Sequence, residues 1–336
     1  MFKNKKILIT GGTGSLGRAL TKRLLKEDVK TIRILSRNEN KQMMMASEFS
    51  DDDRLRFLIG DVRDKPRLLR AVEGVDIVFH AAALKHIDVV EYNPFEAVKT
   101  NVLGSQNIID VCHELNIETA IAIGTDKAVS PLNVYGATKL LMEKLFVTAS
   151  SYVDKEKHRT KFLAIRYGNV LGSSGSVIPR FVEQILSKKK LTITDPNMTR
   201  FTITMDEALD FILNSVAESR GSDTFVPKLK AYNIMDLKDA LFSLLGDTGF
   251  EITKIRPGEK ITEVLINSYE MRRTVEGDKN YVIIHDEKSD DEISELYPNH
   301  KRCTTFKEYS AMNTESLSKN ELQEMIKPLI PYRNKN

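Results

Sequence analysis

The chain has 336 residues and a net charge of +3 at pH 7, a balance that argues against a dedicated nucleic-acid binder. Its 41% hydrophobic and 29% charged residues are ordinary for a soluble globular protein, and two cysteines and six histidines form neither a disulfide framework nor a metal-ligand pattern. We therefore expect a cytoplasmic protein without a metal, a signal peptide or a membrane partner, since no apolar run is long enough to cross a bilayer.

The first half alternates short apolar runs with amphipathic segments. Strands that alternate with helices pair in parallel through right-handed crossovers. We therefore predict an α/β fold, a doubly wound parallel Rossmann sheet over residues 1–172 to which later segments return. The predicted strands span 6–10, 31–37, 56–62, 75–83, 119–125 and 161–172, and the predicted helices span 15–27, 95–115 and 135–152.

The second half, residues 173–336, has a different pattern. It predicts a smaller α+β lobe that mainly binds substrate, followed by a polar tail from about residue 267. The predicted helices span 177–189, 205–219, 234–246 and 318–330, and the short strands span 191–194, 224–228 and 251–255.

A glycine-rich turn, TGGTGSLG, follows the first predicted strand. Glycines let backbone N–H groups approach a pyrophosphate, and the helix that follows directs its positive N-terminus at the phosphates. Because this spacing lies between a strand and an amphipathic helix, it predicts a dinucleotide-binding loop. The loop residues are Gly11, Thr13, Gly14, Ser15, Leu16 and Gly17.

The end of the second predicted strand indicates which dinucleotide is bound. An acidic residue there would bind the ribose 2′-hydroxyl of NAD. The sequence instead has Ser36 and Arg37, with Lys41 nearby. A hydroxyl and two cations suit a 2′-phosphate better than a diol, so we predict NADP as the cofactor.

Two further strand ends are expected to line the dinucleotide. Asp61 and Val62 end the third strand, where an adenine amino group can be bonded. Ala81 and Ala82 follow the fourth strand, and their small side chains allow the dinucleotide to approach closely.

The stretch GTDKAVSPLNVYGATK holds the predicted redox pair, Tyr135 and Lys139. Residues four apart share one face of a helix, and a lysine beneath a phenol lowers the phenol pKa and makes it a usable base. The same Tyr-x-x-x-Lys spacing recurs at Tyr297, but only the first copy follows a strand of the predicted dinucleotide fold. We therefore place Tyr135 and Lys139 beside the nicotinamide.

Asp126 and Lys127 lie in the same stretch. Simple hydride transfer does not need this adjacent acid and base. They suit an elimination, in which one group removes a proton and the other protonates a departing hydroxyl.

The glycine spacing, the Tyr135/Lys139 pair and AIRYGNVLG resemble the extended short-chain dehydrogenase/reductase family, whose catalytic hydroxyl matches Thr125. Over about residues 1–265, longer segments are similar to the UDP-N-acetylglucosamine 4,6-dehydratases. Tyr135 stands where larger membrane-bound relatives generally carry Met, which favours the short C5-inverting type that starts pseudaminic-acid synthesis. The segments are GGTGSLG, GDVRDKPRL, HAAALKHIDVVEYNPFEAVKTNVLG, TDKAVSPLNVYGATK, RYGNVLGSSGSVIP, DPNMTRF and RPGEK.

The resemblance implies a mechanism. Tyr135 takes the proton of the sugar 4-hydroxyl while hydride passes from C4 to NADP, and Lys139 supports the phenolate and binds the nicotinamide ribose. Lys127 then removes the C5 proton, Asp126 protonates the leaving 6-hydroxyl, and hydride returns to C6.

The resemblance also implies a UDP-sugar substrate and a homo-oligomer, either a dimer or a hexamer. Lys85 follows the fourth predicted strand, and we expect it to face the sugar. The remaining substrate contacts implied by the resemblance are Asn169, Arg200, Arg256 and Glu259.

Other functions remain open at this stage. A UDP-hexose 4-epimerase shares the fold, Tyr135 and Lys139, but it needs neither Asp126 nor Lys127. A non-catalytic NADP-binding regulator would be expected to lose Tyr135 or Lys139, and both are present. A C5-retaining dehydratase and a GDP-sugar substrate are further alternatives.

Overall fold

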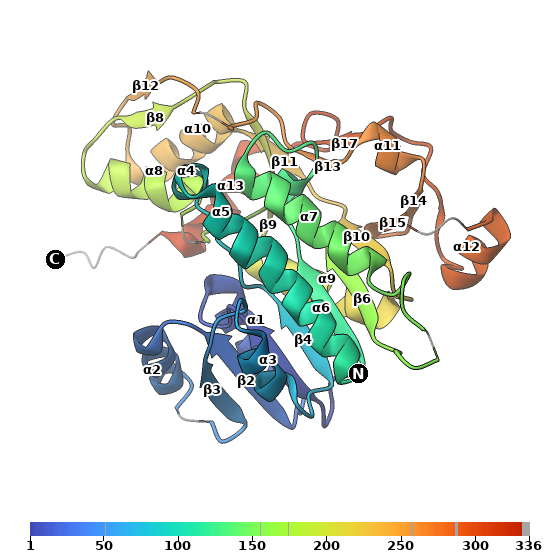
Figure 1. Ribbon diagram of the computed structural model, residues 1–336. Helices are drawn as coiled ribbons and strands as arrows, with labels where there is room; N and C mark the ends of the chain where they lie inside the picture. Colours follow the sequence, from blue (N-terminus) through green and yellow to red (C-terminus); the bar gives the residue numbers. More distant parts are fainter. Residues whose placement is uncertain (51, 155, 174, 257, 286–287, 331–336) are drawn as a thin grey trace.

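The computed structural model describes residues 1–50, 52–154, 156–173, 175–256, 258–285 and 288–330 (Figure 1). Over these residues the largest sheet has ten strands, in the order β16-β14-β15-β10-β6-β5-β4-β1-β2-β3. Six strands from the first half pair in parallel, which confirms the predicted α/β fold with a doubly wound sheet. They are β1 (Lys6–Thr10), β2 (Thr31–Ser36), β3 (Leu55–Ile59), β4 (Ile77–His80), β5 (Thr119–Ile123) and β6 (Lys161–Ile165).

Four strands from the second half extend this sheet. β10 (Asp223–Pro227) pairs in parallel with β6, and β15 (Asn280–Ile284) pairs antiparallel with β10. β14 (Thr274–Glu276) and β16 (Lys301–Arg302) complete the edge. The strand predicted at 224–228 therefore lies in the main sheet. Its apolar pattern shows that it is buried but does not show which sheet it joins.

The strand predicted at 161–172 is divided in the structure. β6 ends at Ile165, and β7 (Asn169–Val170) joins a separate sheet with β9 (Thr199–Ile203) and β11 (Ala231–Asn233). Both pieces and the residues between them are largely buried. The uniform burial of this segment therefore hides the point where the chain changes sheets, although Gly168 lies between the two pieces.

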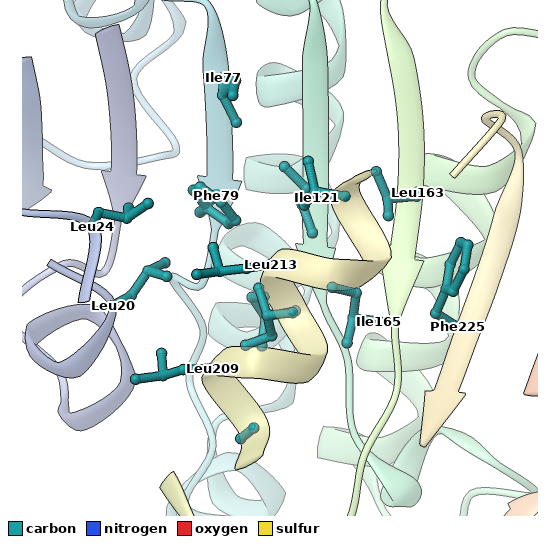
Figure 2. Close-up of a cluster of buried hydrophobic side chains, with 14 of the residues drawn as sticks. Leu20, Leu24, Ile77, Phe79, Ile121, Leu163, Ile165, Leu209, Leu213 and Phe225 are labelled. Carbon is teal, nitrogen blue, oxygen red and sulfur yellow. The ribbon is translucent and has the colours of Figure 1, made fainter. Parts of the chain in front are cut away.

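Helices cover both faces of the main sheet. One face carries α1 (Ser15–Leu24), α2 (Glu39–Glu48) and α9 (Met205–Glu218), and the other carries α3 (Lys65–Val72), α6 (Gly104–Glu114) and α7 (Val134–Thr148). Figure 2 shows Leu209 and Leu213 of α9 against the sheet, near Phe79 of β4. Burial of each such side chain stabilises the fold by about 1.5–3 kcal/mol. A helix from the second half thus helps to form the core of the first half.

The helix predicted at 95–115 is interrupted. α4 (Ile87–Tyr92) and α5 (Pro94–Ala97) lead into a π-helix, η1 (Val98–Leu103), before α6 begins. Asn101 of this π-helix accepts a hydrogen bond from the Leu84 amide at 2.8 Å and donates to the Leu84 carbonyl at 3.0 Å and to Thr138 Oγ1 at 3.0 Å. Short π-helical turns often occur at functional sites, and this one fixes the loop after β4 to helix α7.

Part of the second half has an apolar core of its own, separate from the cores beside the main sheet. Leu171, Phe181, Leu237 and Leu322 belong to that core. Its short sheets pair β8 (Leu191–Ile193) with β12 (Phe250–Ile252) and β13 (Val264–Ile266) with β17 (Tyr309–Ser310). Its helices are α8 (Val177–Leu186), α10 (Ile234–Leu245) and α13 (Lys319–Ile326), with a 3₁₀ turn, η3 (Lys327–Leu329). By contrast, α12 (Asp290–Leu296) packs against the core of the main sheet, and α11 (Ser268–Met271) belongs to a further apolar cluster.

Within the described part of the chain, no helix combines the length and apolar character needed to cross a membrane. The same residues contain no group of His, Cys, Asp and Glu side chains arranged to hold a metal ion.

Candidate active site

The glycine-rich turn lies between the carboxyl end of β1 and the start of α1. Gly11 has a φ of +65°, and a Cβ at this position would stand 2.9 Å from the backbone of Ala82. Glycine therefore lets the turn approach the end of β4. Gly14 is the N-cap of α1 and supplies no side-chain cap. The turn thus has the glycine cradle and the helix N-terminus that fit a pyrophosphate.

The neighbouring residues predicted for this loop support the turn. Thr13 is almost fully buried, and Ser15 begins α1. Leu16 packs against the apolar core on this face of the sheet, and Gly17 is buried within the helix. The turn is therefore anchored to the core through Leu16 and helix α1.

The end of β4 is fixed by a buried hydrogen-bond chain. Thr10 Oγ1 lies 2.8 Å from His80 Nδ1 and accepts a hydrogen bond from the Ala82 amide at 3.2 Å. The Ala81 amide donates to the Thr10 carbonyl at 3.2 Å. Burial, with a further contribution from Lys139, lowers the pKa of His80 to about 3, so this histidine is neutral. Ala81 and Ala82 therefore form a rigid, uncharged wall beside Gly11.

The carboxyl ends of β2 and β3 meet at a cluster of charges. Arg37 Nη1 lies 3.8 Å from Asp61 Oδ2, and Arg63 Nη2 lies 2.7 Å from the same oxygen. Burial opposes ionisation of Asp61, but its hydrogen bonds from Arg63 outweigh burial and lower its pKa. Ser36 accepts a hydrogen bond from Gln42 at 3.0 Å. The structure thus brings Ser36, Arg37 and Asp61 together.

Three further residues belong to this end of the site. Lys41 is exposed in the first turn of α2, where its amide donates to Asn38. The Val62 carbonyl accepts a hydrogen bond from Asn107 at 3.0 Å. Sequence reasoning missed Arg63, although its position two residues after Asp61 was a usable signal.

Thr125, Asp126 and Lys127 follow the carboxyl end of β5. Asp126 and Lys127 lie in a 3₁₀ turn, η2 (Asp126–Ala128), which Thr125 caps. Thr125 Oγ1 donates to Asp126 Oδ1 at 2.9 Å, and Lys127 Nζ lies 3.1 Å from the same oxygen. The Asp126 side chain is only 1% exposed and its Oδ2 has no hydrogen-bond partner, whereas Lys127 is 22% exposed. The acid is therefore buried behind a base that reaches the surface of the site.

Helix α7 begins directly against this turn. Asn133 caps the helix by accepting a hydrogen bond from the Gly136 amide at 2.7 Å. A Cβ at position 136 would stand 2.2 Å from the Lys127 carbonyl oxygen, so the two segments touch through their backbones. Tyr135 is thereby held beside Thr125, with which its hydroxyl forms a hydrogen bond. The structure brings together Thr125, Asp126, Lys127 and Tyr135.

The expected pKa effect of Lys139 on Tyr135 is wrong. Burial raises the pKa of Tyr135, Lys127 opposes this rise, Asp126 adds to it, and the Thr125 hydrogen bond lowers it. Lys139 is not among the causes because its ammonium points elsewhere: it donates to the Ile123 carbonyl at 2.6 Å and contacts Met142 Sδ at 2.9 Å. Lys127 is therefore the cation that favours the phenolate in this structure.

Lys139 has an unusual pKa of its own. Burial lowers it to about 7, against the opposing charge of Glu143 one turn further along α7. Glu143 is fully buried and forms an ion pair with Arg166, which also bonds Glu270 at 2.9 Å and the Leu265 carbonyl at 2.8 Å. Lys139 therefore lies near a buried charge cluster, in which the side chains of Glu143 and Arg166 are fully removed from solvent.

Of the predicted substrate residues, Arg200 lies in the Asp126–Lys127 group. Its Nη1 donates to the Ile261 carbonyl at 2.9 Å, and its Nε lies 3.9 Å from Glu263 Oε1. That carboxylate is also 3.4 Å from Lys127 Nζ. Asn169 lies on β7, opposite Thr202 of the strand that carries Arg200.

Arg256 and Glu259 lie together beside the start of α7. The Arg256 amide donates to the Glu259 carboxylate at 3.2 Å, and Asn133 donates to the Gly258 carbonyl at 2.9 Å. Lys85 lies in the loop that Asn101 anchors, where burial lowers its pKa. Ser174 of the segment GSSGSV and Pro257 of RPGEK lie outside the described residues.

Sequence reasoning missed four residues of this group. Tyr232 is buried, and burial raises its pKa to about 12 while the charges of Arg200, Lys127 and Asp126 act on it. The others are Tyr167, Lys260 and Glu263. Glu263 carried no distinctive signal because KITEVL contains no recognisable motif, and its partner Lys127 is 136 residues away.

Known proteins are similar to this chain over nearly its whole length. An inverting UDP-N-acetylglucosamine 4,6-dehydratase from Campylobacter jejuni subsp. jejuni is 43% identical over 335 residues, covering 97% of this chain and 98% of the relative. A UDP-glucose 4-epimerase from Rickettsia felis is 39% identical over 331 residues, covering 97% and 96%. The crystal structure of Pen from Bacillus thuringiensis superimposes with a TM-score of 0.90 at 35% identity, covering 98% of this chain and all of that one.

The family model described as polysaccharide biosynthesis protein matches residues 7–285, a span that includes the glycine-rich turn, the Asp126–Lys127 turn and Glu263. This chain therefore belongs to the polysaccharide biosynthesis protein family, alongside relatives that are inverting UDP-N-acetylglucosamine 4,6-dehydratases.

Proposed function

We propose that this protein is a UDP-N-acetylglucosamine 4,6-dehydratase of the C5-inverting type, which acts in surface-glycan or pseudaminic-acid synthesis. The observation that carries the proposal is the contact between buried Asp126 and partly exposed Lys127 beside Tyr135: Lys127 Nζ and Asp126 Oδ1 lie only 3.1 Å apart at the end of β5. An acid and a base in contact suit the removal of water. The similarity to the Campylobacter dehydratase supports the same substrate.

Each residue of the group has a role in this reaction. Tyr135 accepts the proton of the sugar 4-hydroxyl, and Thr125 orients that phenol through their hydrogen bond. Lys127 removes the C5 proton, and Asp126 protonates the leaving 6-hydroxyl. Each acid or base role contributes about 10²–10⁴-fold to the rate.

The cofactor of this reaction is a nicotinamide dinucleotide, which we propose to be NADP. When bound, it supplies hydride acceptance from C4 and hydride return to C6. Gly11 and Gly14 would hold the pyrophosphate, and Lys139 the nicotinamide ribose. The choice of NADP rests on Arg37 and Lys41, because a guanidinium and an ammonium suit a 2′-phosphate.

The substrate contacts are proposed on the same basis. Arg200 lies beside the Lys127 group and Arg256 at the start of α7, and cations suit the diphosphate of a UDP-sugar. Glu259, Lys85 and Asn169 complete the proposed set. Most of residues 173–336 would then form the substrate-binding lobe, and a cytoplasmic location stays a prediction.

A second candidate function is a UDP-hexose 4-epimerase, because the Rickettsia relative is 39% identical over almost the whole chain. An epimerase uses Tyr135 but has no step that needs Asp126 as an acid. Incubation with UDP-N-acetylglucosamine followed by mass spectrometry distinguishes the two. Loss of one water supports the dehydratase, whereas an unchanged mass with a galacto-configured product supports the epimerase.

The same incubation in D₂O tests the stereochemistry. The inverting reaction places deuterium at C5 with the opposite configuration, which proton NMR of the product reports. Retention at C5 would refute the inverting assignment and leave the dehydratase itself in place.

We also propose that the protein is a homo-oligomer. Helices α4, α5 and α7 lie beside one another (Figure 1). Together with η1 they carry apolar side chains that are half or more exposed, and a patch of this kind marks an interaction surface. They are Val89, Tyr92, Phe95, Leu103 and Leu141. Light scattering after gel filtration should give a mass at least twice that of the chain, and Leu141→Glu should lower it.

A further inference from the structure

The Lys127 side chain has a second acidic neighbour that the proposed reaction does not yet use. Glu263 immediately precedes β13, and its carboxylate is 4% exposed. Glu263 Oε1 lies 3.4 Å from Lys127 Nζ. Asp126 Oδ1 lies 3.1 Å from the same nitrogen. The ammonium is therefore bound between two buried carboxylates from distant parts of the chain.

Both carboxylates keep one oxygen without a partner. Asp126 Oδ2 and Glu263 Oε2 are buried side-chain atoms with no hydrogen bond. Burying a polar atom without a partner costs about 1–3 kcal/mol. Here two such atoms lie in the same group of residues. A buried polar atom without a partner calls for an explanation, and a catalytic role is one.

The ion pairs decide the resting charge of Lys127. Burial alone would lower its pKa, but the charges of Asp126 and Glu263 outweigh burial and raise it. Lys127 is thus an ammonium at rest, whereas the removal of a C5 proton requires the neutral amine. A proton must leave Lys127 before it can act as a base.

We propose that Glu263 is a positioning residue that holds the Lys127 ammonium against Asp126, so that one proton transfer between these two neighbours prepares both the base and the acid. This inference rests on the proposed dehydratase function. The proton moves from Lys127 Nζ to Asp126, leaving a neutral amine and a carboxylic acid. The amine then takes the C5 proton while Asp126 gives its proton to the leaving hydroxyl. One water leaves, and the ammonium and the carboxylate are restored.

Other groups face Lys127 from several elements. These groups also act on the pKa of Lys127, but Asp126 and Glu263 are its two anionic partners among the described residues. The positive charge of Arg200 on β9 lowers the pKa of Lys127. The charges of Glu263, Asp126 and Lys127 also act on the pKa of Lys260. Tyr135 on α7 and Tyr232 on β11 have pKa values raised by burial, so both are neutral at rest.

The first experiment measures Lys127 without turnover. Wild type, Glu263→Gln and Glu263→Asp are labelled with acetic anhydride across a pH series, and mass spectrometry compares the Lys127 peptide with exposed Lys30. Loss of the Glu263 charge should raise Lys127 labelling about tenfold near pH 8, because a one-unit fall in pKa is tenfold in neutral amine. Glu263→Asp keeps the charge and should stay near wild type. Equal labelling in Glu263→Gln and wild type would overturn the proposal.

The second experiment separates elimination from oxidation. In Glu263→Gln, water loss should fall about 10–100-fold even though more of Lys127 is neutral, because the amine is no longer held against Asp126 for the proton transfer. Transient cofactor reduction should change less than about twofold, because Glu263 forms no ion pair with Lys139. An equal fall in both steps would mean a merely structural role. Glu276→Gln, which breaks a peripheral ion pair with Lys228, is the matched control and should keep both rates.

The third readout tests the proton transfer itself. In the wild type, the ratio of water loss to cofactor reduction should stay level between about pH 6 and 8, because the proton remains inside the pair. A tenfold rise per pH unit would show that Lys127 loses its proton to solvent, and would refute the transfer. The labelling experiment does not need turnover. If the wild type removed no water, the proposed function would be refuted, while labelling would still test whether Glu263 controls the charge of Lys127.

Discussion

The Lys127 carbonyl lies so close to Gly136 that a Cβ at position 136 would stand 2.2 Å from the oxygen. This contact joins the two halves of the site, because Lys127 belongs to the proposed elimination pair and Gly136 follows Tyr135 on α7. The relative position of the base and the phenol is thus set by backbone packing and does not depend on flexible side chains.

Replacement of Gly136 by Ala should therefore lower both the stability of the protein and its activity. The methyl group must push the η2 turn and α7 apart, which should lower the free energy of unfolding by about 1–3 kcal/mol. A displacement near 1 Å should lower kcat about 10²-fold. Urea unfolding and steady-state kinetics measure the two effects. Ala137→Ser, at an exposed position of the same helix, should change neither quantity, and a fully active Gly136→Ala would show that the contact can relax.

Lys127→Ala should separate the two stages of the proposed reaction. Tyr135 and Lys139 remain, so substrate should still reduce the bound cofactor transiently, but no 4-keto-6-deoxy product should be released. Stopped-flow absorbance and mass spectrometry report the two events. Lys144→Ala, which removes an exposed lysine of α7, should keep both. Normal turnover by Lys127→Ala would remove this residue from the mechanism.

Arg37→Ala tests the choice between NADP and NAD. The side chain is 55% exposed, and its Nη1 lies 3.8 Å from Asp61 Oδ2, a separation longer than a hydrogen bond, so its N–H groups can still donate to a 2′-phosphate. A lost charge-assisted hydrogen bond is worth about 1.5–3 kcal/mol, so the Kd for NADP should rise about 10–100-fold while that for NAD changes little. Calorimetric titration with each dinucleotide measures this. A parallel rise for both would assign Arg37 to folding or to the shared part of the cofactor.

The low pKa of Lys139 predicts a pH-dependent stability. Burial lowers it to about 7 in the folded state, against about 10.4 for an exposed lysine. Between these values the unfolded chain binds more protons, so the folded state gains stability as the pH rises. Lys139→Met removes this dependence. The unfolding free energy of the wild type relative to Lys139→Met should thus rise by about 2–3 kcal/mol from pH 6 to pH 9.

Urea unfolding at the two pH values, under matched salt, measures that difference. Lys188→Met is the control, because Lys188 is exposed and should show no such dependence. A difference between the wild type and Lys139→Met that stays level or falls as the pH rises would mean that Lys139 keeps its charge in the folded protein.

Local patterns predicted much of this fold and part of its site. The glycine-rich turn, the six parallel strands and the Asp126–Lys127 turn are each encoded within a few consecutive residues, and the structure contains all of them. The π-helix at Val98–Leu103 left no local sign, since it lies inside a continuous helical pattern. The division of the sixth predicted strand had only a weak sign, the Arg166 and Gly168 that separate its two pieces.

The pairings that depend on chain reversal were not predictable from local patterns. Glu263 meets Lys127 only because β13 is brought back beside the end of β5. The pKa of Tyr135 was misjudged for a related reason. Spacing places Lys139 on the same face of α7, but it does not reveal that the Ile123 carbonyl takes the ammonium.

The position of β10 has a consequence for the newly made chain. β10 covers β6, yet its residues, 223–227, are synthesised well after β6 is complete. Until then β6 is an open sheet edge whose residues after Lys161 are destined to be fully buried. Such an edge readily pairs with another chain. A ribosome-bound chain that stops short of residue 223 should therefore aggregate or recruit a chaperone, whereas one extended past Ile284 has the strands that cover this edge.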